Sequence, residues 1–248
     1  MSSRKSKRQK TISLVDSVRE VNASMRLTLD EQIQELKLNI LKMGSLMEES
    51  IYKAVKSLAH QDLDLAREVI SSDQEIDSLE NAIEARCLSL LALQNPLASD
   101  LRKITTILKI VTDLERMADE AVNIAEVTIM NGNEPLIKPL EDIPAMAEAA
   151  AKMVKGCLDA FVNQDQDLAI EVVKADDQVD EKYSALFDEL VEMIIEQAPF
   201  SGTTQAIRLL FVARYLERIA DHATNIAERT IYMITGDRVT HRKGWWKE

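Results

Sequence analysis

Apolar residues recur every three to four positions along most of the chain, which is the period of an amphipathic α-helix. The pattern is broken at five prolines: Pro96, Pro135, Pro139, Pro144 and Pro199. Polar clusters at 60–64 and 163–167 mark two further turns, where an Asp can cap the next helix by accepting from its free N–H groups. The pattern therefore predicts six helices, near residues 29–59, 63–94, 97–130, 142–163, 166–198 and 203–235.

An internal repeat explains this layout. The sequence QDLDLA at 61–66 returns as QDQDLA at 164–169, a shift of 103 residues. Further along, LERMAD at 114–119 matches LERIAD at 216–221, a shift of 102. Three helices joined by short loops form an antiparallel bundle, so the repeat predicts an all-α protein of two tandem three-helix bundles. The predicted parts are an N-terminal extension (1–24), the first unit (25–131), a linker (132–141), the second unit (142–236) and a C-terminal tail (237–248).

Charge divides the chain into a basic start and an acidic body. The net charge is −12, and the first ten residues carry five positive charges, so the remainder carries −17. Such a body repels phosphate backbones, and we expect no nucleic-acid partner for it. The basic extension is expected to be a disordered arm. With no apolar run of about 20 residues and no signal peptide, the protein is expected to be cytoplasmic. Cys87 and Cys157 lie in helical patterns without metal-ligand spacing, which is typical of small core residues.

One acidic pattern recurs at matching places in both units: an acid is followed four residues later by Asp. Residues four apart lie on one helix face, separated by about 6 Å along the axis. The pairs are Asp73 with Asp77, Glu115 with Asp119, Asp176 with Asp180, and Glu217 with Asp221.

The turn between the second and third predicted helices places two of these pairs at the same height. Asp77 and Glu115 each lie nineteen residues from Pro96, and Asp73 and Asp119 each lie twenty-three residues from it. In an antiparallel hairpin, residues equally distant from the turn lie side by side. The second unit repeats this arrangement about its own proline to within one residue, so two carboxylate quartets are predicted.

Four carboxylates within reach of one another repel, and a cation or protonation relieves that repulsion. Oxygen ligands suit Mg²⁺, Ca²⁺, Mn²⁺ or iron better than a closed zinc site with thiolates. Asn123 and Asn225, four residues beyond each motif aspartate, are candidates to add a carbonyl oxygen, and His222 to add a nitrogen in one unit only. The sequence therefore predicts metal binding at both quartets.

Two other interpretations remain open. In one, the acids only form solvated helix faces on a plain scaffold, helped by Arg116 beside Asp119 and Arg218 beside Asp221. Alternatively, the chain is a carboxylate-rich protein that stores metal or performs redox chemistry. A di-iron oxidase would need Glu-x-x-His motifs, and the chain has none. It also has no Gly-rich phosphate loop and no nucleophile elbow, so we expect that it is not an enzyme.

The repeated motif resembles that of the PhoU family, in which each unit carries an E-R-x-x-D core followed by A-x-N-I-A. Here the motif stands at 115–119 with 121–125, and at 217–221 with 223–227. The first unit also has the family's Asp-Leu-Arg at 100–102, whereas the second has Thr-Thr-Gln at 203–205 where the first has Leu-Arg-Lys at 101–103. The resemblance covers about residues 25–236 and leaves the N-terminal extension unexplained.

The resemblance implies two pseudo-symmetric bundles and, in at least some members, multinuclear metal clusters on the acidic motifs. The expected metal is divalent or multinuclear: iron, zinc, manganese or magnesium. The resemblance also implies a non-enzymatic role between a phosphate-specific ABC transporter and a sensor histidine kinase, damping the starvation response when phosphate is plentiful. Such a protein reaches the membrane only through its partners, and dimerisation is left open.

Overall fold

The structure is a computed structural model that describes residues 2–196 and 200–239, and within these ranges it contains helices, turns and no strand. Pro199 and residues 240–248 of the predicted C-terminal tail lie outside the described residues. The expected all-α fold with six helices is confirmed. The helices are α1 (Ser2–His60), α2 (Leu63–Gln94), α3 (Ala98–Asn131), α4 (Asp142–Asn163), α5 (Gln166–Ile195) and α6 (Phe200–Thr235).

The repeated Gln-Asp pair makes the same turn in both units. Gln61 and Gln164 end α1 and α4 in the left-handed backbone region, each with φ of 54°. Asp62 then caps α2 by accepting from the Leu65 backbone N–H at 3.0 Å. In the second unit Asp165 accepts from the Leu168 N–H at the same distance. The sequence similarity is therefore a similarity of turn geometry, and the predicted Asp caps are confirmed.

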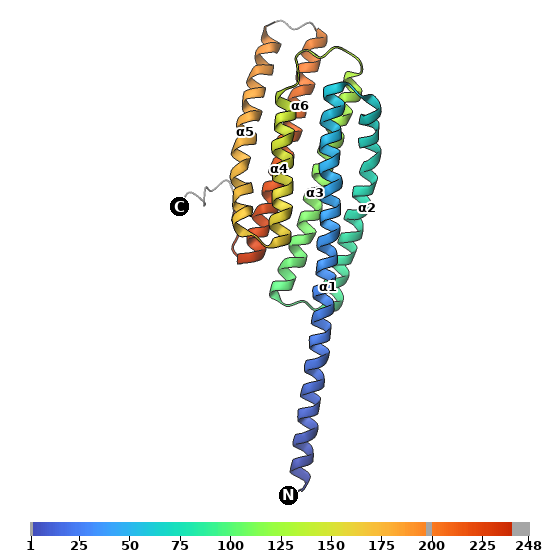
Figure 1. Ribbon diagram of the computed structural model, residues 1–248, viewed down its shortest axis with the longest axis vertical. Helices are drawn as coiled ribbons and strands as arrows, with labels where there is room; N and C mark the ends of the chain where they lie inside the picture. The colour runs from blue at the N-terminus through green and yellow to red at the C-terminus, as the bar shows by residue number, and fades with distance from the viewer. Residues whose placement is uncertain (1, 197–199, 240–248) are drawn as a thin grey trace.

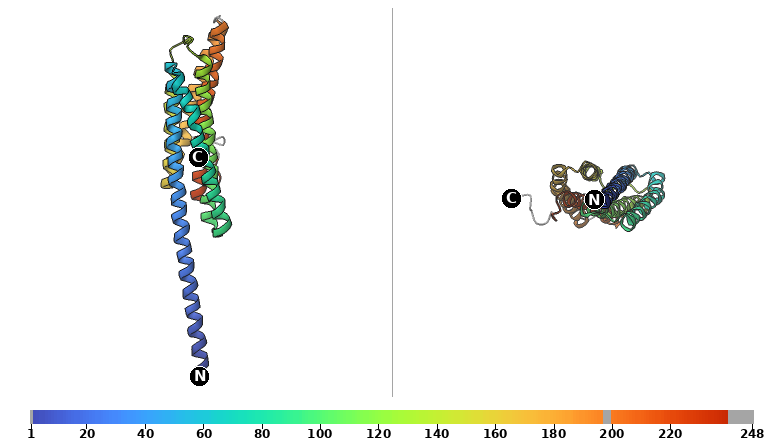
Figure 2. Two further views of the ribbon diagram at one scale, coloured as in Figure 1. Left: turned by 90° about the vertical axis from the view of Figure 1, so that its right-hand side faces the viewer. Right: turned by 90° about the horizontal axis from the view of Figure 1, so that it is seen from below.

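Each unit is an antiparallel three-helix bundle, and the two lie side by side (Figure 1). Helix α3 packs along α6, and α1 packs along α4, while α2 and α5 lie at the two outer edges. Seen end on, α3 and α6 form one broad face of the molecule, and α1 and α4 form the opposite face (Figure 2). We call the antiparallel contact between α3 and α6 the seam.

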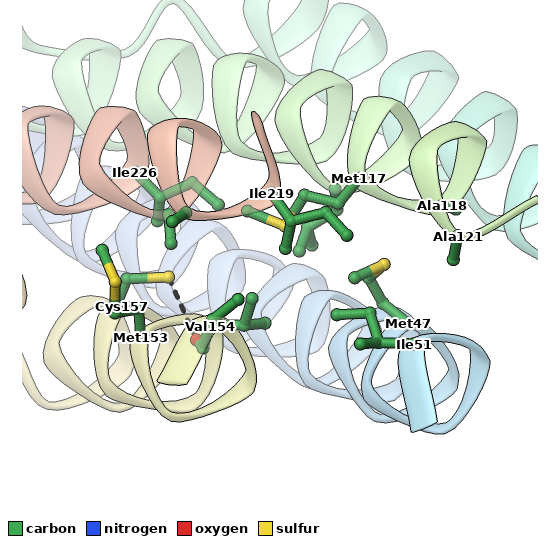
Figure 3. Packing of buried hydrophobic residues seen from close by; sticks show 14 of the residues in the cluster. Met47, Ile51, Met117, Ala118, Ala121, Met153, Val154, Cys157, Ile219 and Ile226 are labelled. Carbon is green, nitrogen blue, oxygen red and sulfur yellow. Dashed lines mark hydrogen bonds between the residues drawn. The ribbon is translucent and has the colours of Figure 1, made fainter. Parts of the chain in front are cut away.

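Buried hydrophobic residues of both units form one continuous core. Figure 3 shows Met47 and Ile51 of α1, Met153 of α4 and Ile219 of α6 gathered in it. Both cysteines are buried and free, as the sequence predicted. Burial raises the pKa of Cys87 to about 12, and it also raises the pKa of the Cys157 thiol, so both stay protonated. The two predicted bundles thus share a core along their contact.

The first helix differs from the prediction at its start. Helix α1 begins at Ser2 rather than near residue 29, so the extension expected to be a disordered arm continues the helix. The physical reason is that the first 43 residues contain neither Gly nor Pro. In Figure 1 this part of α1 runs beyond the turn between α2 and α3. Within the described residues, no helix has the combination of length and apolar character needed to cross a membrane.

Candidate functional site

The first predicted quartet lies between α2 and α3. Asp73 and Asp77 are on α2, and Glu115 and Asp119 are on α3. Burial, together with the charges of Asp77 and Asp119, raises the pKa of Asp73 to about 6. The interaction of Asp73 with Asp119 joins the two residues that lie equally far from Pro96. The structure therefore brings acids of the two helices to the same level of the hairpin.

Charges of the same cluster also change the pKa of Glu115. Burial raises its pKa to about 7, aided by the charges of Asp119, Glu80 and Asp77, while Arg116 opposes the rise. This half-buried carboxyl sits in a helix whose neighbouring stripe is apolar. Its raised pKa means that the folded protein favours a proton, or another cation, at this position.

Sequence reasoning missed one member of this group. Burial and the charges of Glu84, Asp77 and Asp119 raise the pKa of Glu80, so it belongs electrostatically to the quartet. The signal was present in the sequence, because Asp73, Asp77, Glu80 and Glu84 follow the spacing of one helix face. The first cluster is therefore an acidic stripe on α2 opposite two acids on α3.

The second quartet lies between α5 and α6. Asp176 is buried, and that burial raises its pKa to about 7, with the charges of Asp180 and Asp221 adding to the rise. Glu217 is also buried, and its pKa rises to about 7 through burial and the charge of Asp221. The acids predicted on these two helices again influence one another across the hairpin.

The two carboxylate oxygens of Glu217 differ in their hydrogen bonding. Arg214 lies one helical turn earlier and donates to the Glu217 Oε1. In the described part of the chain, the buried Glu217 Oε2 has no hydrogen-bond partner. A buried carboxylate oxygen without a donor is costly unless it is protonated or meets a cation.

The two clusters are not equivalent. At the places where α2 carries Glu80 and Glu84, α5 carries Tyr183 and Phe187, whose ring centroids lie 6.1 Å apart. The second cluster has Arg214, and the first has a threonine at the matching position. The first cluster is thus richer in negative charge, which favours stronger cation binding there.

The donor set fits a hard divalent cation, because it consists of carboxylate oxygens, and the pKa values of Asp73, Glu115, Asp176 and Glu217 within it are raised. However, among the residues that the structure describes, no three His, Cys, Asp or Glu side chains converge closely enough to form a ready-made metal site. Asn123 donates its side-chain N–H to Glu120 Oε2 at 3.3 Å, and Asn225 is half-buried on α6. The assignment of metal ligands therefore stays a prediction.

The seam beside the clusters contains a polar network that the sequence analysis missed. Arg218 of α6 donates to Glu120 of α3 at 2.6 Å. Asp113 of α3 is almost fully buried, and its Oδ1 lies 3.0 Å from His222 Nδ1. The guanidinium of Arg229 lies against the other oxygen of Asp113. Acids of one unit thus meet bases of the other.

This network bears on two sequence-based interpretations. His222 was a candidate metal ligand, and its Nδ1 is engaged by Asp113 across the seam, so only its Nε2 could bind a metal, and that role stays a prediction. Burial lowers the pKa of His222, and the charges of Arg116 and Arg218 lower it further. Arg218 was expected to stabilise Asp221 within its own helix, but it reaches Glu120 instead. No local pattern could reveal these pairs, because their partners lie about a hundred residues apart in the chain.

Comparisons with known proteins agree with this arrangement. Residues 40–128 and 143–230 each match the family model of the PhoU domain. A "phosphate-specific transport system accessory protein PhoU homolog" from Aquifex aeolicus is 45% identical over 216 residues, covering 87% of this chain and 97% of that protein. The homolog from Clostridium acetobutylicum is 40% identical over 215 residues, covering 86% and 97%.

Solved structures show the same fold. The crystal structure of PhoU from Pseudomonas aeruginosa has a TM-score of 0.80 at 35% identity and covers 84% of this chain and 99% of its own. The phosphate transport system regulatory protein PhoU from Streptococcus pneumoniae has a TM-score of 0.79 at 32% identity, with coverage of 86% and 99%. Two matched domains, on a fold shared over most of the chain, place this protein in the PhoU family.

Proposed function

We propose that this protein is a non-enzymatic, cytoplasmic regulator of phosphate uptake and phosphate-starvation signalling. In this role it would act as an adaptor between a phosphate-specific ABC transporter and a sensor histidine kinase. The observation that carries the proposal is the match of both units to the PhoU domain, together with relatives named as accessory proteins of phosphate-specific transport. The absence of a recognisable catalytic motif from the sequence is compatible with docking.

The broad face made by α3 and α6 is the surface best suited to that docking. Helix α3 carries Glu115 and Asp119, and α6 carries Glu217 and Asp221; the two aspartates are exposed. An acidic cluster in each unit favours a basic partner surface and steers association by charge. Association should therefore slow as salt is added.

We further propose that both clusters bind divalent cations. Asp73, Asp77, Glu115 and Asp119 would hold metal in the first unit, and Asp176, Asp180, Glu217 and Asp221 in the second. Asn123 and Asn225 are the predicted additional oxygen donors. The raised pKa values of Glu115, Asp176 and Glu217 support this proposal, because a cation would relieve the same repulsion that now favours a proton. Bound metal would thus lower the negative charge of the docking face.

A deletion strain tests the regulatory role. A starvation-responsive reporter should become active in excess phosphate when the gene is deleted, and the wild-type gene should silence it again. Complementation with Glu115→Ala plus Asp119→Ala should restore less silencing than Glu126→Gln, an exposed change on the same helix. A reporter that stays silent in the deletion strain, with no second copy of the gene, would contradict the regulatory role.

Elemental analysis tests the metal separately. The purified double variant should retain roughly half of the bound metal, since the other cluster is intact. An unchanged metal content would contradict the assignment. The alternative of metal storage or redox chemistry would instead predict oxidase activity from iron- or manganese-loaded protein and no effect of deletion on the reporter.

A further inference from the structure

A shallow pocket of about 350 Å³ opens in the seam at the end where α6 finishes. It lies near the start of α3, about two turns from the motif acids on that helix. Its volume falls within the range of small-molecule sites, which begins at about 300 Å³. The pocket is lined by Thr105, Thr106, Lys109, Glu228, Arg229, Tyr232, Arg238 and Val239.

Three cationic side chains line this pocket in a protein whose net charge is −12. Lys109 comes from α3, Arg229 from α6, and Arg238 from the residues that follow α6. Glu228 is the acid of the lining. Of the ion pairs formed by described residues, one engages Arg229, through Asp113, and none engages Lys109 or Arg238. The pocket therefore retains positive charge after the carboxylates are counted.

The Arg229 guanidinium is held in place rather than left free. Its Nη1 donates to the Lys109 backbone carbonyl at 2.9 Å and lies against the Asp113 carboxylate. Burial lowers the pKa of Arg229, although an arginine stays charged at any physiological pH. A fixed guanidinium at a pocket wall is a preorganised donor for an oxyanion. Arg238 lies over the Tyr232 ring, 5.9 Å from its centroid, which positions a second guanidinium at the rim.

The internal repeat indicates that these charges are not required for packing. The positions equivalent to Lys109, Arg229 and Tyr232 in the other unit are Phe211, Val127 and Met130. At the opposite end of the seam Phe211 and Met130 are 53% and 58% exposed, and Arg208 there donates to the Met130 carbonyl and to Asn131 Oδ1. Because the same fold accepts apolar residues at the places equivalent to Lys109 and Arg229, these two charges are not needed to form the seam.

We propose that this pocket binds a phosphoryl group, either inorganic phosphate or the phosphate of a small phosphomonoester. A doubly charged tetrahedral anion can accept hydrogen bonds from two guanidinium groups and an ammonium group at once. A carboxylate has fewer acceptor oxygens and a single charge, so it suits three cationic groups less well. The Tyr232 ring and Val239 supply an apolar wall for an organic part of the ligand. The proposal rests on this pocket and does not depend on the metal clusters.

Equilibrium dialysis of the purified full-length chain tests the proposal, with chelator present so that cluster-bound metal cannot capture the anion. Separate arms use inorganic phosphate, AMP as a phosphomonoester, and adenosine as the phosphate-free control. We expect saturable binding of phosphate or AMP and none of adenosine. Tighter binding of AMP would identify an organic phosphate as the ligand, and tighter binding of phosphate would identify the free anion.

A charge-reversal variant locates the site. Lys109→Glu combined with Arg238→Glu should weaken binding at least about tenfold, because both side chains are exposed and two attractive charges become repulsive. The control Lys152→Glu makes the same kind of change on α4, where the side chain is 74% exposed. Circular dichroism checks that each variant is folded. If the double variant misfolds, binding is measured with Lys109→Ala instead. The proposal fails if neither anion binds by about 10 mM, or if the pocket variant binds as well as the control.

Discussion

Replacing Glu217 by Gln tests whether repulsion among the carboxylates of the second acidic cluster destabilises the folded protein. The Glu217 side chain is 12% exposed, and burial together with the charge of Asp221 raises its pKa from 4.5 to about 7. A carboxyl group with a higher pKa in the folded than in the unfolded protein binds its proton more tightly when folded. Without a cation, the ionised group therefore destabilises the fold, and its removal should be stabilising at pH 8.

The expected size follows from the pKa difference. A rise from 4.5 to about 7 corresponds to roughly 3 kcal/mol, at about 1.4 kcal/mol per pH unit. That pKa already includes the opposing effect of the half-exposed Arg214, and relaxation of the site reduces the energy below this figure. Glu217→Gln should thus increase the free energy of unfolding by about 1–3 kcal/mol at pH 8 in metal-free protein.

The pH dependence gives the sharper test. Below about pH 4.5 the carboxyl is protonated in both the folded and unfolded states, so Glu and Gln should be nearly equivalent. As pH rises from about 4.5 through 7, the wild-type protein progressively loses the stability of its protonated form, and the variant does not. The advantage of Gln should therefore grow across this window and level off above it.

Urea unfolding followed by circular dichroism, with chelator present, measures the free energy of unfolding of the variant and the wild-type protein at pH 5, 6.5 and 8. Glu192→Gln, an exposed change on α5, controls for the loss of one negative charge from an acidic protein. In saturating divalent cation the sign should reverse, because Gln is a poorer ligand than a carboxylate. A variant that is no more stable than the control at pH 8, or whose advantage is independent of pH, would refute the reasoning.

Three further outcomes follow from the structure. Asp113→Asn should destabilise the fold by about 3–5 kcal/mol in urea unfolding, because it leaves Arg229 without its partner in the seam. Gly44→Ala should cost up to about 2 kcal/mol, since the new Cβ would clash with the buried Leu158 side chain where α1 meets α4, while the higher helix propensity of Ala offsets about 1 kcal/mol. Asp165→Ala should cost about 1 kcal/mol through loss of the α5 cap, and calorimetry that finds no change would contradict the capping role.

Much of the fold was encoded in local signals. The Gln-Asp turns at the starts of α2 and α5 could be predicted, because a left-handed residue followed by an Asp cap depends on neighbouring residues alone. The distance count about Pro96 also anticipated the interaction between Asp73 and Asp119, since an antiparallel hairpin fixes which residues lie level. Local spacing was therefore enough to bring the acids together.

The sequence could not reveal what depends on the packing of one unit against the other. Asp113 meets His222 and Arg229 across more than a hundred residues, and no spacing rule indicates which helix faces form the seam. The start of α1 was missed for a different reason. The prediction weighed the basic charge of the extension, whereas α1 continues through this segment, which lacks Gly and Pro.

The seam also explains how two similar units can favour each other over copies of themselves. The repeat aligns Glu120 of α3 with His222 of α6, and Asp113 with Tyr215. In the observed seam, Asp113 meets His222, and Glu120 meets Arg218. If two α3 helices were paired in the same way, Glu120 would occupy the place of His222 and face Asp113, and two buried carboxylates would repel. Divergence at these few positions therefore favours the pairing of unlike units within a single chain.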